Sequence, residues 1–583
     1  MRYQLINPIN PGYSALEQVL TNRGIPRSEI QHYLNTTDDD INDFNLLGGD
    51  RLRMAAIKLI QLVQTEGDAL VIVDCDCDGF TSAALLINYL YDHFPSWVTY
   101  HLNWFIHSGK QHGLSDVNVV ETAAKYKLII CPDASSNDYE YHLKFLDAGV
   151  DVIVLDHHEA EIVSPNAIII NNQLCDYPNK HFSGAGITWQ FCRYIDSLLC
   201  TNYANNYLDL VALGNTADMM SLRSIETKHL ILKGFRDENI HNPFIATMAE
   251  ANAFSIGDKL TPMGAAFYIA PFVNAMVRSG TAEEKELMFQ SFLKFKAFDI
   301  ILSTKRGHRP GETEQLVTQA VRVAKNVKAR QTKVQDATLE KLESMIEEQN
   351  LLDHKVLLFL LEQGAVDKNV AGLVANKFMA KYQRPCCILT KVDDAYQGSA
   401  RGCDLAGVTE FKDLCENTGL TTFVAGHQGA FGIGIKEENI DKFMAATDLA
   451  LRDMPEEPVY YVDYIYKGTN VNGEQILDIA QLNDLWGKDI DEAMVAIESL
   501  KVSSDMVNIY VKKDKTLKIT LPSRVSIMLF HAPDDICDLL QNISGYVELN
   551  IVGTCNANVW NGWTTPQVFI ENYEIVGQNK YCF

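Results

Sequence analysis

The sequence lacks the long apolar runs that a membrane-spanning helix requires. Such a helix needs about 20 consecutive apolar residues, and the densest apolar stretch, residues 356–361, is far shorter. Residues 1–8 also lack an apolar segment of the kind that opens a secretory signal. We therefore expect a protein that makes no membrane contact and is not secreted.

A cysteine framework is lacking as well. The 13 cysteines are scattered along the chain without paired spacing, which is typical of the reducing cytoplasm and not of a disulfide-stapled secreted domain. Cys75 and Cys77 lie close together, but no second close Cys/His pair accompanies them, so a zinc site is disfavoured. These absences predict a cytoplasmic globular protein.

An excess of positive charge is missing too. The chain has 50 Lys and Arg residues against 75 Asp and Glu residues, a net charge of −25, which argues against coating nucleic acid with the whole surface. A local basic groove remains compatible with this balance, because charges act within a Debye length of about 10 Å. Residues 303–334 form one basic stretch, either a solvated helix face or a nucleic-acid track. Its basic residues are Lys305, Arg306, Arg309, Arg322, Lys325, Lys328, Arg330 and Lys333.

Short apolar runs mark the first folded region of the chain. Residues 69–73, 127–131 and 150–155 are nearly continuous apolar segments, and helical patterns over 81–91 and 139–148 separate them. Buried parallel strands have this composition, and their alternation with helices predicts an α/β domain with right-handed crossovers. At 583 residues the chain exceeds what one hydrophobic core supports, so further domains are expected.

Two more regions follow a largely helical segment. Strands at 355–361 and 386–390 around a helix at 370–381 predict a second α/β domain. After residue 458 the chain is rich in strand patterns, and five such strands suit a small all-β barrel of the OB type. These expected strands are residues 459–466, 506–511, 517–521, 547–552 and 567–572.

Acidic and histidine residues follow each strand of the first region. The first strand runs into Asp74-Cys-Asp-Cys-Asp-Gly79, the second is followed by Asp133, and the third by Asp156-His-His158; Asp218 follows a later apolar helix. The carboxyl ends of parallel strands meet at one crevice, so these side chains should converge. Crowded carboxylates repel one another unless a cation neutralises them, and mixed Asp and His ligands suit Mn²⁺ or Mg²⁺. One or two such ions could activate water for attack on a phosphodiester.

A calcium-binding EF-hand loop also opens with the pattern Asp-x-Asp-x-Asp-Gly. That loop requires a bidentate Glu at its twelfth position, and the residue here is Leu85. The motif also follows a strand pattern instead of a helix, so the EF-hand interpretation is disfavoured.

The ordered motifs resemble the DHH phosphoesterase family, named for the triplet found here as Asp156-His157-His158, and its RecJ-type exonucleases above all. The resemblance spans nearly the whole chain and includes Ser183-Gly-Ala-Gly186, Gly398-Ser-Ala-Arg401 and Ala425-Gly-His-Gln-Gly-Ala-Phe-Gly432. It implies a parallel-sheet DHH domain, a second α/β domain called DHHA1, joined by helices, and a C-terminal OB-like barrel. The implied divisions are an N-terminal helical segment at 1–45, the DHH domain at 46–238, a helical connector at 239–345, DHHA1 at 346–455 and the OB-like domain at 456–583.

The resemblance also implies roles for individual residues. The metal ligands would be Asp76, Asp78, Asp133, His157 and Asp218, with Asp74 coordinating or close by. His158 would contact the scissile phosphate, so that His158, Asp156 and Asp133 form the catalytic set. A phosphate pocket of Ser399, Arg401 and His427 would hold the 5′ end, and Arg278 would contact the strand further along. Trp560, Trp563 and Phe569 would either stack on bases or pack in the barrel core.

Three departures mark a divergent member. Some members carry a metal-binding His at the position of Ile72, the second motif reads Asp133-Ala-Ser135 in place of Asp-x-Gly, and an Arg that precedes a Gly-Tyr-Gly turn is missing. His107 or Lys110 must replace the phosphate contact of that Arg, or the contact is lost. The sequence therefore leaves open whether one or two ions bind.

The resulting expectation is a cytoplasmic, metal-dependent 5′→3′ exonuclease acting on single-stranded DNA, monomeric by resemblance. The two α/β halves would form a channel that admits one strand but not a duplex. RNA as a second substrate, recruitment by a single-strand-binding protein, and a role in DNA repair, recombination or nucleotide scavenging stay open. Two alternatives are a DHH phosphodiesterase for short oligonucleotides or cyclic dinucleotides, disfavoured by the C-terminal domain, and a non-catalytic replication scaffold, disfavoured by the complete ligand set.

Overall fold

The computed structural model describes residues 1–109, 111–160, 162–455, 457 and 459–579. It separates into two compact units. The parallel-sheet unit comprises Arg23–Ala329 and Asp484–Asp491, and the mixed-sheet unit comprises Met1–Asn22, Arg330–Asn483 and Glu492–Phe583.

A five-stranded sheet with the order β3-β2-β4-β5-β6 forms the centre of the parallel-sheet unit, and all of its neighbouring strands are parallel. The three strands expected from the sequence are present as β2, β4 and β5, which confirms the predicted α/β class. The sequence did not predict β3 and β6, which lie at the two edges. The strands are β2 (Ala69–Val73), β3 (Leu102–Ile106), β4 (Leu128–Pro132), β5 (Asp151–Asp156) and β6 (Ile168–Asn171).

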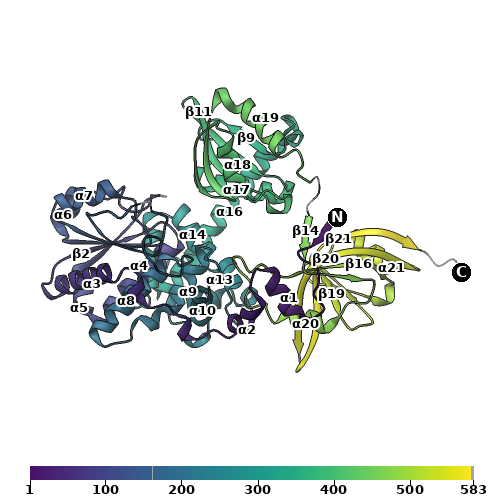
Figure 1. The fold of residues 1–583 in the computed structure, drawn as a ribbon, viewed down its shortest axis with the longest axis horizontal. Helices are drawn as coiled ribbons and strands as arrows, with labels where there is room; N and C mark the ends of the chain where they lie inside the picture. The colour runs from purple at the N-terminus through teal and green to yellow at the C-terminus, as the bar shows by residue number, and fades with distance from the viewer. Residues whose placement is uncertain (110, 161, 456, 458, 580–583) are drawn as a thin grey trace. The chain divides into compact units, whose positions relative to one another are not determined.

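Helices cover both faces of this sheet (Figure 1). On one face lie α3 (Gly49–Gln64), α4 (Cys77–His93) and α8 (Gly184–Leu199), and on the other lie α6 (Val119–Lys125) and α7 (Tyr139–Asp147). Because both faces are covered, β2 is apolar at every position, and all five of its residues are buried. This double burial explains why the strands read as continuous apolar runs in the sequence.

More helices complete the parallel-sheet unit after the sheet. They are α9 (Leu208–Ala217), α10 (Ile225–Gly234), α11 (Pro243–Ala251), α12 (Ala253–Ile256), α13 (Pro262–Tyr268), α14 (Ala270–Ser279) and α15 (Ala282–Phe292). A short hairpin of β7 (Ile300–Leu302) and β8 (Thr313–Gln315) interrupts the expected helical connector. The 33-residue helix α16 (Leu316–Glu348) follows it.

The mixed-sheet unit contains a second sheet with the order β12-β13-β11-β10-β9. Strands β9 and β10 are parallel, as expected from a helix between them, and the other pairs are antiparallel. The expected helix is present as α17 (Lys368–Tyr382). The strands are β9 (Leu357–Leu361), β10 (Cys386–Val392), β11 (Ala395–Arg401), β12 (Thr421–His427) and β13 (Ala430–Lys436).

A seven-stranded sheet follows, with the order β15-β16-β20-β21-β19-β18-β17. Within the described residues no pairing joins β15 to β17, so the sheet is not closed into a complete barrel. The sequence did not predict β16, because a bulge between Ile497 and Leu500, with Ser499 at φ 51°, breaks its alternating pattern. The strands are β15 (Tyr464–Lys467), β16 (Met494–Val502), β17 (Val507–Val511), β18 (Lys515–Thr520), β19 (Ser526–Leu529), β20 (Tyr546–Trp560) and β21 (Trp563–Asn579).

The first residues of the chain belong to this C-terminal region. Strand β1 (Arg2–Leu5) pairs in parallel with β14 (Val459–Val462). Helix α1 (Ala15–Asn22) contacts α20 (Gly473–Ala480), where the backbone N–H of Leu16 donates to Oδ2 of Asp478 at 2.9 Å. The sequence predicted only short helices in this segment, so the strand is a correction to that prediction.

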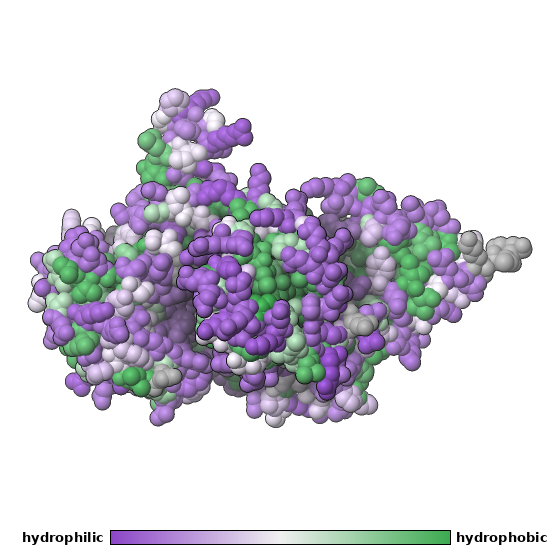
Figure 2. All heavy atoms as spheres, turned by 90° about the horizontal axis from the view of Figure 1, so that it is seen from above, coloured by the Kyte–Doolittle hydropathy of each residue, from purple (hydrophilic) through white to green (hydrophobic). Residues whose placement is uncertain are grey.

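The surface agrees with the absence of apolar runs in the sequence. Among the described residues, no helix is both long and apolar enough to cross a membrane. The face shown in Figure 2 is mostly hydrophilic, and its hydrophobic residues lie in separate patches.

Candidate metal centre

The acidic motif after β2 occupies the turn between that strand and α4. Asp76 is the N-cap of α4, and its Oδ1 accepts a 2.9 Å hydrogen bond from the backbone N–H of Gly79. A Cβ at Gly79 would lie 2.6 Å from the Cβ of Asp74, so only glycine permits this tight turn. The turn thereby presents three carboxylates at the carboxyl end of β2.

Asp78 is held by the start of another helix. The backbone N–H groups of Gly184 and Ala185 donate to Oδ2 and Oδ1 of Asp78 at 2.6 Å and 3.2 Å. Both residues are in the first turn of α8, whose N-terminal N–H groups and dipole favour a negative charge. The Ser-Gly-Ala-Gly motif therefore fixes the position of one carboxylate.

Asp133 follows β4 and has a left-handed backbone, with φ 67°. Its side chain is 1% exposed, and within the described residues neither carboxylate oxygen takes part in a hydrogen bond. A Cβ at Gly184 would lie 2.4 Å from Oδ1 of Asp133, so the glycine makes room for this side chain. A buried carboxylate without hydrogen bonds is costly, and its presence here indicates a missing positive partner.

His157 brings the strand ends together. Its Nε2 lies 3.2 Å from Oδ1 of Asp133, 3.3 Å from Oδ2 of Asp218 and 3.9 Å from Oδ2 of Asp78. Asp218 reaches this point from the C-terminal end of α9. One imidazole nitrogen thus faces three carboxylates that come from different elements.

Asp156 and His158 form a supporting pair beside His157. Oδ1 of Asp156 lies 2.7 Å from Nδ1 of His158, and its Oδ2 accepts from the backbone N–H of Ser136 at 3.0 Å. Although burial opposes it, the hydrogen bond from His158 holds the pKa of Asp156 well below its usual range. Against the effect of burial, the same hydrogen bond raises the pKa of His158 to about 9. Asp156 therefore orients His158 and keeps it protonated.

The electrostatics of the cluster favour a bound cation. Burial, followed by the neighbouring carboxylates, raises the pKa of Asp133 and Asp218 well above the usual value and that of Asp76 to about 6. Carboxylates that resist ionisation beside one another are stabilised by divalent ions. Donor atoms within 4.8 Å of one another include the sets Asp78/His157/Asp218 and Asp74/Asp76/Asp133. The donors fit a hard or borderline metal with oxygen and imidazole ligands.

One member of this region was not found from the sequence. Nδ1 of His112 lies 2.7 Å from Oδ2 of Asp74, and the Sγ atom of Cys75 lies 3.4 Å from Nε2 of the same ring. The hydrogen bond to Asp74 raises the pKa of His112 to about 11. His112 lies five residues after His107, in the same loop, for which the sequence predicted only a phosphate contact by His107 or Lys110.

The structure does not support His107 as that phosphate contact. Its side chain is fully buried, and its Nδ1 lies 2.6 Å from Oδ1 of Asp116. The backbone carbonyl of His107 accepts a hydrogen bond from Nζ of Lys285 at 3.1 Å. His107 therefore stabilises the loop after β3 and is turned away from solvent. The other candidate, Lys110, lies outside the described residues.

Arg278 lies on a helix that touches the acidic motif. The side chain of Asn274, on α14, accepts a 3.1 Å hydrogen bond from the backbone N–H of Cys77. Arg278 is one turn further along α14 and is partly exposed. It is thus within the surroundings of the cluster, on the helix that contacts α4.

The predicted phosphate pocket lies in the mixed-sheet unit. Arg401 on β11 is opposite Ala430 of β13, which is opposite His427 of β12. Ser399 is two residues before Arg401, so all three polar side chains share one face of the sheet. A Cβ at Gly372 of α17 would lie 2.5 Å from Nη2 of Arg401, so this glycine leaves room for the guanidinium.

The aromatic residues expected at the C-terminal sheet differ in exposure. Trp563 is 79% exposed at the start of β21. Phe569 packs edge-to-face against Phe530, with ring centroids 5.1 Å apart, which favours its packing role. The side chain of Trp560 lies outside the described residues.

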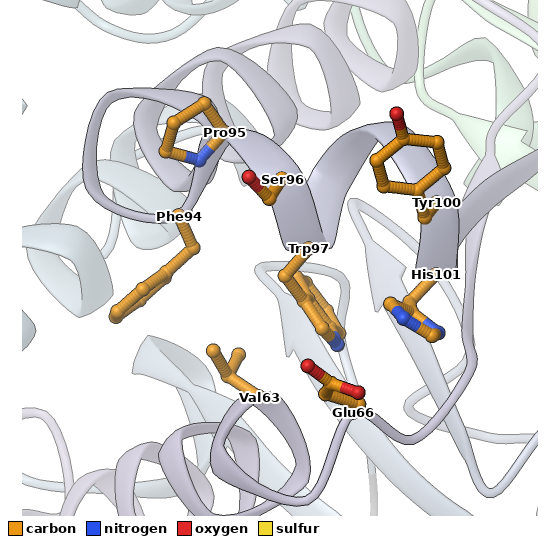
Figure 3. Close-up of a pocket in the computed structure, with 8 residues that line it drawn as sticks. All are labelled: Val63, Glu66, Phe94, Pro95, Ser96, Trp97, Tyr100 and His101. Carbon is orange, nitrogen blue, oxygen red and sulfur yellow. The ribbon is translucent and has the colours of Figure 1, made fainter.

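A separate pocket lies on the opposite side of the parallel sheet. Its lining comes from the end of α3 and from α5 (Pro95–His101), which lead into the amino ends of β2 and β3. Figure 3 shows Phe94, Trp97 and Tyr100 around it, together with the polar side chains of Glu66, Ser96 and His101. The metal-type donors gather instead at the carboxyl ends of the strands, where α/β proteins bind ligands.

Comparisons with known proteins agree with this geometry. The model of the DHH family, N-terminal domain, matches residues 68–215. A protein of Bacillus subtilis strain 168 that carries the name SPbeta prophage-derived single-strand DNA-specific exonuclease YorK is 32% identical over 582 residues, covering 99% of this chain and 98% of that protein. The single-stranded-DNA-specific exonuclease RecJ of the same strain is 25% identical over 570 residues, covering 95% of this chain and 67% of the relative.

Solved structures share the fold. RecJ from Thermus thermophilus, crystallised in complex with Mn²⁺, superposes with a TM-score of 0.69 at 20% identity, covering 97% of this chain and 76% of that one. The same protein in complex with Mg²⁺ gives a TM-score of 0.65 at 18% identity, covering 100% of this chain and 79% of that one. The YorK protein is 32% identical to this chain over nearly the full length of both, which establishes that the two proteins belong to one family. The chain therefore belongs to the DHH family and is one of its RecJ-like members.

Proposed function

We propose that this chain is a metal-dependent exonuclease that hydrolyses single-stranded DNA from its 5′ end. The observation that carries the proposal is the buried carboxylate of Asp133, which makes no hydrogen bond within the described residues and lies among Asp78, His157 and Asp218. Such a group costs stability unless a cation neutralises it, and its position at the carboxyl ends of the parallel strands is that of a catalytic crevice. The names of the relatives, single-strand DNA-specific exonucleases, support the substrate.

Asp76, Asp78, Asp133, His157 and Asp218 would hold one or two Mn²⁺ or Mg²⁺ ions. Bound there, such ions supply charge neutralisation and lower the pKa of water. RecJ of Thermus thermophilus has been crystallised with either metal, which supports both as cofactors of this chain.

His158 has a distinct role in the proposal. Its side chain is half exposed, and Asp156 holds its Nδ1, so Nε2 is the atom that can donate to a phosphate oxygen. With a pKa of about 9 the imidazole carries a positive charge at neutral pH. We assign it to binding the scissile phosphate and stabilising the charge that develops there.

The polarity of digestion is assigned to the pocket of Ser399, Arg401 and His427. An arginine can clamp a terminal phosphate with two parallel hydrogen bonds, and the glycine-rich strands beside it let backbone groups approach. Arg278 and the exposed Trp563 are proposed contacts further along the strand, through phosphate and through base stacking.

The cytoplasm is the proposed compartment. All 12 cysteines within the described part of the chain are free, and several are buried in the two α/β cores, as in proteins of reducing compartments.

The decisive experiment uses 5′-phosphorylated, 3′-labelled single-stranded DNA with Mn²⁺, beside a matched duplex, an RNA strand and a dinucleotide. We expect the single strand to disappear from its 5′ end, the duplex to remain, and EDTA or Asp133→Ala to abolish cleavage. Digestion of the dinucleotide alone would replace the proposal with a short-oligonucleotide phosphodiesterase. Tight binding without cleavage under every divalent metal would indicate a scaffold, and equal digestion of RNA would widen the substrate class.

A further inference from the structure

We infer that His112 is a metal ligand, and that together with Asp74 it completes a second cation position next to the one formed by Asp78, His157 and Asp218. This inference rests on the proposed metal dependence. It adds to that proposal a residue from the loop after β3, which neither the motifs nor the comparisons assign.

The donor atoms of this second position are already gathered. Nδ1 of His112 lies 2.7 Å from Oδ2 of Asp74, and the Sγ of Cys75 is 3.4 Å from the same ring. One donor atom from each of the three residues lies within 4.8 Å of the others. Donors that share one octahedral ion with bonds of about 2.1 Å are about 3 Å apart, so only a few tenths of an ångström separate this arrangement from coordination.

Two shared carboxylates connect this position to the first one. Asp74 also belongs to the group Asp74/Asp76/Asp133, whose donor atoms lie within 4.8 Å of one another. Asp133 in turn contacts His157, and neither of its buried oxygens makes a hydrogen bond within the described residues. Asp133 thus has one oxygen to offer to each of two neighbouring ions, the arrangement used by two-metal phosphodiesterases.

The loop that carries His112 is built onto Asp74. The backbone N–H of Gly113 donates to Oδ1 of Asp74 at 3.1 Å, and the N–H of Leu114 donates to Oδ2 of Asp138 at 2.8 Å. Gly113 has φ 62°, and a Cβ there would lie 2.3 Å from Oδ2 of Asp138. Glycine is therefore required at this position, and it fixes the residue before it against the acidic motif.

The neighbouring strand cannot supply the nitrogen ligand instead. Ile72, on β2, is fully buried in an apolar cluster. Leu114, two residues after His112, is buried in the same cluster, so the loop packs onto the same core. The imidazole therefore approaches Asp74 from the loop, while the strand position contributes only to the core.

The donor set also indicates which ions this position prefers. Imidazole nitrogen binds Mn²⁺, Co²⁺ and Zn²⁺ better than it binds Mg²⁺, and the nearby thiol of Cys75 adds to this preference. We therefore expect the second position to fill with Mn²⁺ and to remain largely empty in Mg²⁺ alone.

The test measures metal binding in the full chain, independently of nuclease activity. Titration with Mn²⁺, followed by the electron paramagnetic resonance of the unbound ion, counts the ions bound by the wild type, His112→Gln and His101→Gln. The matched control, His101, also pairs with an aspartate, Asp68, at 2.9 Å in the same unit but away from the site. We expect two ions for the wild type and the control, and a second ion bound at least about tenfold more weakly by His112→Gln.

A second measurement needs no variant. Nitrogen couplings to bound Mn²⁺, seen by electron spin echo modulation, should come from two imidazoles in the wild type, those of His157 and His112. Unchanged Mn²⁺ affinity in a folded His112→Gln protein, or coupling to a single imidazole in the wild type, would overturn the inference and leave His112 as a hydrogen-bonding partner that positions Asp74. Failure of the wild type to bind any Mn²⁺ would instead overturn the proposed function itself.

Discussion

The backbone N–H of Gly184 donates a 2.6 Å hydrogen bond to Oδ2 of Asp78. The same glycine lies against Asp133, where an added Cβ would come within 2.4 Å of a carboxylate oxygen and 2.6 Å of the Cα. One residue at the start of α8 therefore sets the spacing of two proposed metal ligands.

The first prediction concerns this spacing. Gly184→Ala should lower the rate of single-strand digestion by at least about 100-fold, because a displacement near 1 Å at a catalytic group has this effect. Initial rates under saturating Mn²⁺ measure it, and circular dichroism confirms the fold. Gly49→Ala is the matched control, because nothing lies within 4 Å of its added Cβ. Equal activity of the two variants would contradict the proposed role of Gly184.

The second prediction separates stability from function at two buried aspartates. Asp133 makes no hydrogen bond within the described residues, whereas Asp196 accepts from Thr201 at 2.5 Å and from the N–H of Ala204 at 2.8 Å. In EDTA, Asp133→Asn should therefore raise the melting temperature, since it removes a carboxylate whose ionisation is opposed by burial and by the neighbouring carboxylates. Asp196→Asn should lower the stability by about 1–3 kcal/mol.

Differential scanning calorimetry with and without Mn²⁺ measures both effects. Mn²⁺ should raise the melting temperature of the wild type and of Asp196→Asn, because an ion that binds only the folded state stabilises it. It should have much less effect on Asp133→Asn. A lower melting temperature for Asp133→Asn in EDTA would show that this carboxylate stabilises the fold.

The third prediction follows from a buried lysine. Burial lowers the pKa of Lys228 to about 8, where its Nζ donates to the backbone carbonyl of Tyr33 and lies 4.2 Å from that ring's centroid. A folded-state pKa below the unfolded value means that the charged form is penalised only in the folded chain. The penalty is complete below a pH of about 8 and fades as the pH rises toward 10.5, the ordinary pKa of lysine.

Denaturant unfolding of the wild type and Lys228→Met between about pH 7 and 9.5 tests this sign. The free energy of unfolding of the wild type should rise relative to that of the variant as the pH increases. A difference that is constant, or that falls with pH, would contradict the lowered pKa.

The fourth prediction concerns the hairpin of β7 and β8. Its tip presents Lys305, Arg306 and Arg309, all exposed and, within the described residues, without an acidic partner. In contrast, Arg322 pairs with Glu314. In a chain of net charge −25, such cations are suited to phosphate contacts.

Neutralising all three to Gln should weaken binding of single-stranded DNA without changing sequence preference. The slope of log K against log salt should fall by about 0.7 for each lost phosphate contact. Fluorescence anisotropy between 50 and 200 mM salt, roughly the range over which such effects are large, gives the slope. The control is Lys144→Gln, which removes a surface cation on α7. An unchanged slope in the triple variant would show that these three residues make no phosphate contact and belong to a solvated surface.

The sequence predicted the convergence of the acidic and histidine side chains better than it predicted their surroundings. Asp133 and His157 could be identified because each directly follows a buried strand, and strand ends of a parallel sheet converge whatever the loops do. His112 could not, because its approach to Asp74 depends on the left-handed turn at Gly113 and on the packing of Leu114. His107, one of the two residues that the sequence offered for a phosphate contact, is buried and pairs with Asp116.

Strand prediction failed for a related reason. Strand β2 is apolar at every position because helices cover both of its faces, whereas edge strand β3 has only one fully buried residue, Leu102. Strand β16 carries a bulge at Ser499 that shifts its alternation. Local composition indicates strands with a uniform environment and misses those whose two faces or two halves differ.

Because β1 pairs with β14, the first strand of the chain cannot reach its native pairing until most of the chain has been synthesised. Arg2 is paired with Val459, so a ribosome must release almost the whole of the intervening chain before the first strand finds its partner. The Arg23–Ala329 part of the parallel-sheet unit can fold while translation continues, whereas β1 remains an unpaired strand until β14 has been synthesised. Premature termination before residue 459 would thus yield a chain with its acidic cluster folded and an unpaired strand exposed, a product prone to aggregation and to removal by proteases.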